Sequence, residues 1–256
     1  MVGIAAVAKG VLLEIVRKKD MYVLLILLGV SMALLSAQTF FGLENVSRYV
    51  RDLGYSLMTL FSLVVAVALS ARQIPEEVER RTVYPLLAKP ISRYGIIVGK
   101  YMGASLAAIL SFSCFFAVYF FFFRISGAGG EWGLLGQSYL LGIFSLLMTA
   151  AIAVFFSTFL TVSANVTLSL LLYFFSSAFS GQVRDLVISS KGWASYAAGS
   201  VYYLIPHYDF YDLRIRITHG WEALPVWAVF SVSAYTAVYI SFLIYLSVRI
   251  FSRRQL

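Results

Sequence analysis

Charged side chains are scarce in this sequence. Only 12% of the 256 residues are Asp, Glu, Lys or Arg, whereas 61% are hydrophobic. A water-soluble domain usually carries about 25% charged residues. This chain therefore has too little polar material to cover a surface that faces water, and its mean hydropathy is +0.85. An ordinary soluble domain is excluded, and an all-α polytopic membrane protein is predicted.

Cysteine and histidine are nearly absent as well. The single cysteine, Cys114, excludes an internal disulfide and a metal cluster built from cysteines. It lies in an apolar stretch, and we interpret it as a small packed hydrophobic residue. Both histidines, His207 and His219, fall in one segment near Asp209 and Asp212. A metal site there is one alternative, but a histidine beside Tyr and Asp is more often an ordinary interfacial residue, so we expect no metal.

A nucleotide-binding P-loop is also missing. The sequence IIVGKYMG contains a Gly-Lys pair, but the upstream glycine spacing and the following Ser or Thr of the G-x-x-x-x-G-K-[ST] motif are not there. We therefore expect this chain to carry no ATPase site and no cofactor, and not to be an enzyme by itself. Energy for any powered transport would come from another chain.

Six apolar runs are long enough to cross a membrane. They cover residues 21–41, 53–71, 96–123, 134–156, 162–179 and 224–250. We expect one transmembrane domain over residues 1–256. Residues 1–20 place apolar side chains at helical spacing, which is typical of an amphipathic helix lying along the membrane; a solvated tail is the alternative. The first run is too long for a signal-peptide core, so no cleavage is expected.

The basic residues are distributed unevenly between the segments that connect these runs. If the N-terminus is cytosolic, the whole net charge of +8 lies on the inner side and the outer side is neutral. This is the positive-inside bias. It predicts a multi-pass protein of the inner or plasma membrane with both termini in the cytoplasm.

Residues 180–223 form the long external segment of this topology. The segment is rich in Tyr and Trp, and such amphipathic aromatic side chains favour the headgroup zone. We therefore expect short helices that lie on the outer interface or dip into it. The residues we single out are Pro206, which interrupts the segment, and His207, Tyr208, Asp209 and Phe210, which follow it.

The predicted spans have no ionisable residue in their interiors. Lys100 and Arg249 lie near inner ends, where long side chains can extend to the headgroups. Ion-coupled transporters normally need buried charges or unwound helices, so an ATP-independent transporter or channel is the less favoured alternative. An enzyme with its chemistry at residues 207–212 is another. Asn165, the one intramembrane asparagine, is interpreted as a helix-packing residue.

Residues 72–95 hold the densest group of charges. A proline precedes Glu76 and Glu77, and both carboxylates suit the positive end of a helix dipole. Arg80 and Arg81 follow them at i,i+4 spacing, which adds favourable ion pairs. This pattern predicts a short cytosolic helix and then a proline-containing turn before the third span. A loop whose charges only set the topology is the alternative.

The same segment resembles the signature of ABC-2-type permeases, in which E-x-E-x-x-T-L-x-x-L-L-x-x-P-[VI]-S-R…G-K follows the second span. The matching positions are Glu77, Glu79, Thr82, Leu86, Leu87, Pro90, Ile91, Ser92, Arg93, Gly99 and Lys100. Arg81 and Val83 depart from the Gly and Leu that the family often has, which blurs the subgroup. The six runs, the N-terminal helix and the external segment also fit, so the resemblance covers nearly the whole chain.

The resemblance implies a permease that forms a homodimer, or a heterodimer with a similar permease, and pairs with two cytosolic ATPase subunits that bind ATP and Mg. The segment would be the coupling helix that docks on the ATPase through Glu76, Glu77, Glu79, Arg80, Arg81 and Thr82. Pro90 would form the turn, and Arg93 and Lys100 would anchor the third span at the headgroups.

The implied activity is export of an apolar or amphipathic molecule, such as a lipid-like compound, a drug or a peptide. The alternative is transmission of force to an external accessory protein, with the tyrosine-rich segment as the contact surface. LIPHYDFYDLR (204–214) is similar to a stretch in permeases of the nitrous-oxide-reductase copper-maturation system. That similarity does not imply copper as the cargo. Nucleic acid is not an expected partner, because the basic residues are spread along membrane edges.

Overall fold

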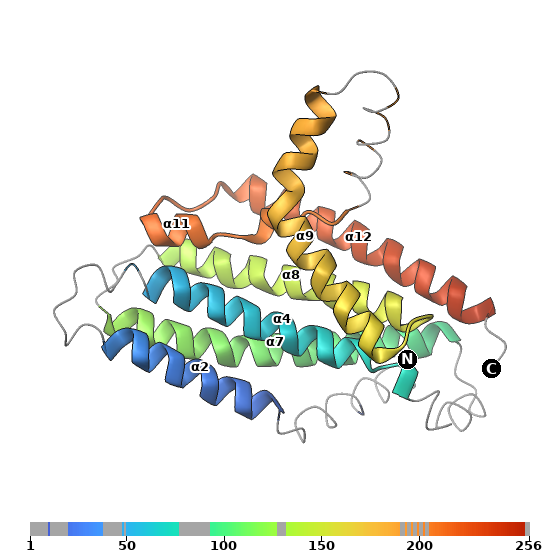
Figure 1. The fold of residues 1–256 in the computed structure, drawn as a ribbon, viewed down its shortest axis with the longest axis horizontal. Coiled ribbons are helices and arrows are strands. Elements are labelled where there is room, and N and C mark those ends of the chain that lie inside the picture. The colour runs from blue at the N-terminus through green and yellow to red at the C-terminus, as the bar shows by residue number, and fades with distance from the viewer. Residues whose placement is uncertain are drawn as a thin grey trace.

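The computed structural model describes residues 10, 20–37, 48, 50–76, 93–126, 132–189, 193, 196, 199, 202 and 205–253 (Figure 1). Helix is the only regular structure in these residues, which confirms the predicted all-α class. The N-terminal amphipathic helix, apart from residues 10 and 20, lies outside the described residues. Most of the coupling segment does too, including Glu77, Glu79, Arg80, Arg81, Thr82 and Pro90.

The described helices follow the predicted apolar runs. They are α2 (Asp20–Ala37), η2 (Val50–Gly54), α4 (Tyr55–Ala71), α7 (Arg93–Ile125), α8 (Trp132–Ser157), α9 (Val162–Ser189), η3 (Tyr208–Tyr211), α11 (Arg214–His219) and α12 (Val226–Arg253). Among the described residues, five helical stretches are long and apolar enough to cross a membrane, and Tyr22–Ala37 is a shorter apolar helix. Together they account for all six predicted runs.

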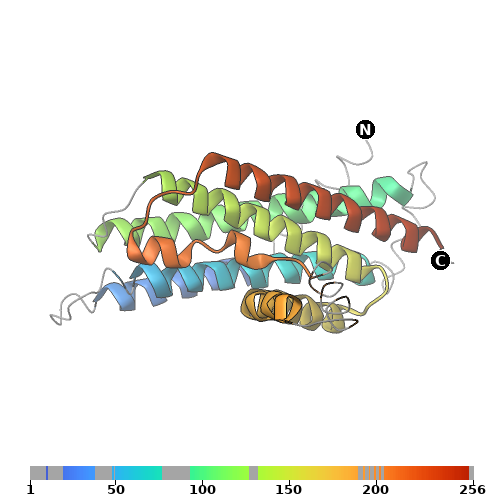
Figure 2. The same ribbon diagram turned by 90° about the horizontal axis from the view of Figure 1, so that it is seen from above.

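A bundle of helices that run along a common direction is formed by α2, α4, α7, α8 and α12, with α8 in the middle (Figures 1 and 2). In the most apolar part of α8, 61% of the residues are buried inside the protein, against 11% for α12 and 17% for α9. Small side chains allow this central position, because the second half of α8 includes the buried residues Ala150, Ala151 and Ala153. The exposed apolar faces of α9 and α12 suit contact with lipid or with another protein.

Helix α9 differs from the others in its direction and its length. It crosses the bundle obliquely, and its second half projects away from it (Figure 1). It also continues to Ser189, beyond the predicted span end at residue 179. Residues 180–189, which the sequence assigned to the external segment, are therefore a continuation of this helix. The part of α9 that is long and apolar enough to cross a membrane is Val162–Phe179, which agrees with the predicted span, so the helix extends beyond the span.

Two glycines permit close approach between helices. A Cβ on Gly142 of α8 would lie 2.5 Å from Cζ of Phe112 in α7, and a Cβ on Gly54 would lie 2.8 Å from Cε of Met32 in α2. Phe112 is 2% exposed and stacks on Tyr139 with ring centroids 5.6 Å apart. The α7–α8 contact therefore depends on the missing side chain at position 142.

Candidate functional site

A cavity of about 190 Å³ lies between α4, α8, α9 and the segment that follows Pro206. Part of its wall is apolar, with Leu60, Leu63, Phe112, Leu146 and Phe174. The rest is lined by residues that carry hydroxyl groups: Tyr55, Ser56, Thr59, Ser62, Ser145, Tyr173, Ser177, Tyr208 and Tyr211. Asp212 and Arg214 complete the lining. The cavity can therefore contact both the polar and the apolar parts of an amphipathic molecule.

The segment from Pro206 to Leu213 is seated in the bundle. Tyr208 and Tyr211 are each 3% exposed. The Tyr208 hydroxyl lies 2.8 Å from Oγ1 of Thr149 in α8, and the Tyr211 hydroxyl lies 2.7 Å from Oγ1 of Thr236 in α12. Burial raises the pKa of both phenols well above the usual value, so both are neutral. These two tyrosines close one side of the cavity.

This finding corrects part of the sequence-based expectation. The short helices η3 and α11 are where they were expected, in the external segment. Their tyrosines, however, point into the protein instead of toward lipid headgroups. Polar groups of the irregular backbone find hydrogen-bond partners inside the protein. Ser176 Oγ of α9 donates to the Pro206 carbonyl and accepts from the Tyr208 N–H at 3.3 Å. Non-helical backbone at membrane depth is tolerated where protein buries it in this way.

His207 lies in a cage of aromatic rings. Its ring is stacked on Phe210 with centroids 5.3 Å apart, and it meets the ring of Tyr202 edge-on at 4.4 Å. Burial lowers the pKa of His207 below its usual value, while the nearby Asp209 opposes this shift. The neutral imidazole is therefore favoured, and its Nδ1 lies 3.3 Å from the hydroxyl of Tyr235. This environment fits a packing role.

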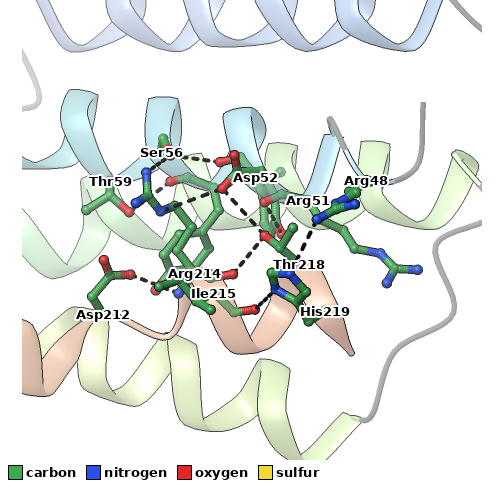
Figure 3. Close-up of polar contacts among 12 residues, drawn as sticks. Arg48, Arg51, Asp52, Ser56, Thr59, Asp212, Arg214, Ile215, Thr218 and His219 are labelled. Atoms are coloured by element: carbon green, nitrogen blue, oxygen red, sulfur yellow. Dashed lines mark hydrogen bonds and ion pairs between the residues drawn. The ribbon is translucent and has the colours of Figure 1, made fainter. Parts of the chain in front are cut away.

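The two histidines do not come together. His219 ends α11, where its Nε2 lies 3.3 Å from Nη2 of Arg48 (Figure 3). Among the described residues, no group of three or more His, Cys, Asp or Glu side chains could hold a metal ion. The two aspartates that we considered as metal ligands also lie in different surroundings. Asp209 is exposed beside the His207 cage, and Asp212 accepts a hydrogen bond from the backbone N–H of Arg214 at 2.8 Å.

A polar cluster joins α11 to the N-terminal end of α4, which the sequence predicts to be the outer end. We call it the outer cluster; its members are Arg48, Asp52, Ser56, Arg214, Thr218 and His219 (Figure 3). Nε of Arg214 lies 3.6 Å from Oδ1 of Asp52, and the Thr218 hydroxyl is 3.5 Å from the same oxygen. Both charged side chains are more than 40% exposed, so the pair contributes about 0–1 kcal/mol. The outer cluster positions α11 at the mouth of the cavity.

A second expectation, that Lys100 extends to the headgroups, is corrected at the other end of the bundle, which the sequence predicts to be the inner end. Lys100 of α7 is 2% exposed, and its Nζ donates to the carbonyl oxygen of Gln73, just after α4. It therefore does not extend to the headgroups; it connects α7 to the start of the coupling segment. In that segment Glu76 pairs with Arg72 at 3.8 Å, while the predicted partner Arg80 lies outside the described residues. Arg93 is the first residue of α7.

Asn165 connects three helices at the same end. It lies in α9, is fully buried, and its Nδ2 donates to the carbonyl oxygens of Ala153 in α8 at 2.8 Å and of Ala71 in α4 at 3.4 Å. Its Oδ1 accepts the hydroxyl of Ser169 at 3.0 Å. The predicted packing role of Asn165 is confirmed by these contacts.

We expect Asn165→Ala to reduce the free energy of unfolding by about 1–2 kcal/mol, because interhelical hydrogen bonds in membranes are worth up to that much. The measurement is an SDS titration of the full chain in detergent micelles. Thr167→Ala is the matched control, since Thr167 is exposed on the same helix and bonds only within it, to the Ser163 carbonyl. Equal losses in the two variants would contradict the packing role.

Sequence reasoning missed the cavity, although a signal for it exists. Ser56, Thr59 and Ser62 recur at three-residue spacing on α4 and all line the cavity. The contributions of α8 and of the Pro206 segment carry no such signal, because they come together only through long-range contacts. The burial of Lys100 was missed because its position near a helix end is equally typical of a side chain that extends to water.

The long apolar helices, their buried hydroxyl groups and the cavity between them define a helical membrane protein with a polar interior site. A family model described as "ABC-2 family transporter protein" matches residues 6–256. The chain therefore belongs to the ABC-2 transporter family and is a membrane-embedded permease of an ABC transporter. No individual curated protein matched the chain in the search that accompanied this comparison.

Proposed function

We propose that this chain is the permease subunit of an exporter that moves an apolar or amphipathic molecule, driven by ATP hydrolysis in a separate ATPase subunit. The observation that carries the proposal is the cavity between α4, α8 and α9. Its mixed wall can hold a small polar group against hydroxyls and an apolar group against Leu60 and Phe174, both of which are partly exposed at the bundle surface. Ligand sites of this mixed character are common in clefts between helices.

The inner end of the bundle supports a route from the motor to this cavity. The coupling segment begins at the end of α4, where Lys100 binds the Gln73 carbonyl and Asn165 binds the Ala71 carbonyl. A displacement of this segment therefore pulls on α7 and α9 as well as on α4. Both α4 and α9 line the cavity, so docking of the ATPase and its closure on ATP would change the shape of the cavity.

We also propose a dimer with two ATPase copies, with both termini in the cytoplasm. The α9 surface supports a protein partner, because Leu171, Phe174 and Phe175 of this helix are between 46% and 58% exposed. The charge distribution supports the orientation, since the net charge of +8 is on the side assigned to the cytoplasm. ATP and Mg would then be bound only by the partner subunit.

The test is extraction of the intact complex from its native membrane in mild detergent. We expect an ATPase with a P-loop to co-purify in equal number. Charge reversal by Glu77→Lys or Glu79→Lys should reduce the amount of bound ATPase about tenfold or more, because removing one member of a docked charge pair costs about 2–5 kcal/mol.

Glu222→Lys is the matched control, since Glu222 is exposed between α11 and α12, outside the coupling segment, and should leave the ATPase bound. Two results would contradict the docking assignment. One is unchanged ATPase association and ATP hydrolysis in both coupling-segment variants. The other is an equal loss in the control variant.

A further inference from the structure

A second groove, separate from the cavity described above, lies between α7 and α12. Its volume is about 330 Å³, and its wall includes Val98 and Met102 from α7 and Ile244 and Val248 from α12. We call it the inner groove, because it lies near the end of the bundle where α7 begins and α12 ends. Met102 is 46% exposed, so the groove opens to the surroundings of the protein and not to the cavity between α4 and α9.

Two exposed tyrosines line the inner groove, and one of them, Tyr94, lies at the end where α7 begins. Tyr94 in the first turn of α7 and Tyr245 of α12 both line it, and both are more than half exposed. Tyrosines of this kind gather at the level of lipid headgroups. The apolar floor and the tyrosines therefore match the two parts of a lipid, an acyl chain and a headgroup.

Arg249 supplies a positive charge at the same end. Its Nε donates to the Tyr245 hydroxyl at 2.9 Å, and its guanidinium carbon lies 5.4 Å from the centre of the Tyr245 ring. These contacts hold the guanidinium beside the groove. Within the described part of the chain, its two terminal nitrogens have no protein acceptor, so they are available to a phosphate. Planar paired donors of this type bind phosphate oxygens in a two-pronged way.

We propose that the inner groove binds one anionic glycerophospholipid, with the phosphate on Arg249 and an acyl chain along Met102 and Ile244. Charge complementarity selects this occupant. The exposed Arg253 lies one turn beyond Arg249, and the charge distribution assigns this end to the cytoplasmic leaflet, which is the anionic one. Basic pockets between transmembrane helices on this side are typical sites for acidic headgroups. The site is independent of the proposed transport activity.

The test is native mass spectrometry of the purified full chain after addition of equal amounts of phosphatidylglycerol and phosphatidylcholine. We expect phosphatidylglycerol to be retained about fivefold better, since one basic residue near the membrane surface contributes that much. Arg249→Gln should remove the preference. Tyr245→Phe, which keeps the charge but removes the hydroxyl that orients it, should reduce the preference partly.

Arg124→Gln is the matched control. Arg124 is also exposed and lies over an aromatic ring, 5.2 Å from the centre of Trp132, but at the opposite end of α7. This variant should keep the preference. Equal retention of both lipids by the unmodified protein would overturn the proposal, as would a preference that survives Arg249→Gln or disappears equally in Arg124→Gln. If Arg249→Gln does not fold, an unchanged preference in Tyr245→Phe overturns it.

Discussion

Replacing Tyr208 with alanine should lower the free energy of unfolding by about 3–5 kcal/mol, which is the usual cost of removing a large buried aromatic side chain. The ring centroids of Tyr208 and of Tyr173 in α9 lie 4.5 Å apart. The Tyr208 hydroxyl is hydrogen-bonded to the hydroxyl of Thr149 in α8. The alanine variant loses both contacts and enlarges the adjoining cavity. The measurement is an SDS titration of the full chain in detergent micelles.

Two further variants separate the causes of this loss. Tyr196→Ala is the control for removing a tyrosine ring, because Tyr196 is 81% exposed, and it should change the stability by less than about 0.5 kcal/mol. Tyr208→Phe keeps the ring and removes only the hydroxyl, so it should cost about 1 kcal/mol. If Tyr208→Ala were no more harmful than Tyr196→Ala, the segment after Pro206 would not be seated in the bundle.

Replacing Gly142 with leucine should destabilise the protein by about 1–3 kcal/mol, the usual cost of overpacking a core. The new Cβ would lie 2.5 Å from Cζ of Phe112. The Phe112 ring cannot move away easily, because it is buried against Tyr139. The leucine would also reach the cavity that Gly142 lines, so the proposed export activity of an otherwise folded variant should fall.

Gly136→Leu is the matched control on the same helix, since a Cβ at Gly136 meets nothing within 4 Å. It should be neutral or should stabilise the protein by up to about 1 kcal/mol, because leucine is the better helix former. Phe112→Ala combined with Gly142→Leu should be less unstable than the sum of the two single variants, because the smaller side chain makes room. Additive losses in this pair would show that position 142 does not contact Phe112.

The candidate site was only partly predictable from the amino-acid sequence. His207 and Tyr208 of the external segment were singled out from the sequence, but their surroundings were assigned to the outer interface. A tyrosine has an apolar ring and a polar hydroxyl, so both the headgroup zone and a hydroxyl-lined protein interior satisfy it. The choice depends on Thr149 and Thr236, which are far from residue 208 in the chain.

Lys100, at the other end of the bundle, is a second residue whose surroundings could not be predicted from the sequence. A lysine near a helix end in a membrane protein usually extends to water, and nothing in its neighbours along the chain indicates otherwise. The structure instead gives it the Gln73 carbonyl as an acceptor. An acceptor supplied by the backbone of a distant segment is not visible in any local pattern, because every residue has the same carbonyl group.

The sequence by itself determined the class of this protein, its membrane-crossing helices and, through the signature around Glu77 to Lys100, its family. These features follow from local composition, since burial of a helix in lipid depends on its own length and hydropathy. Only the tertiary structure decided the oblique course of α9, the seating of Tyr208 and Tyr211 and the cavity that they close. Those features depend on shape and on hydrogen-bond partners contributed by distant helices, and hydropathy carries no information about either.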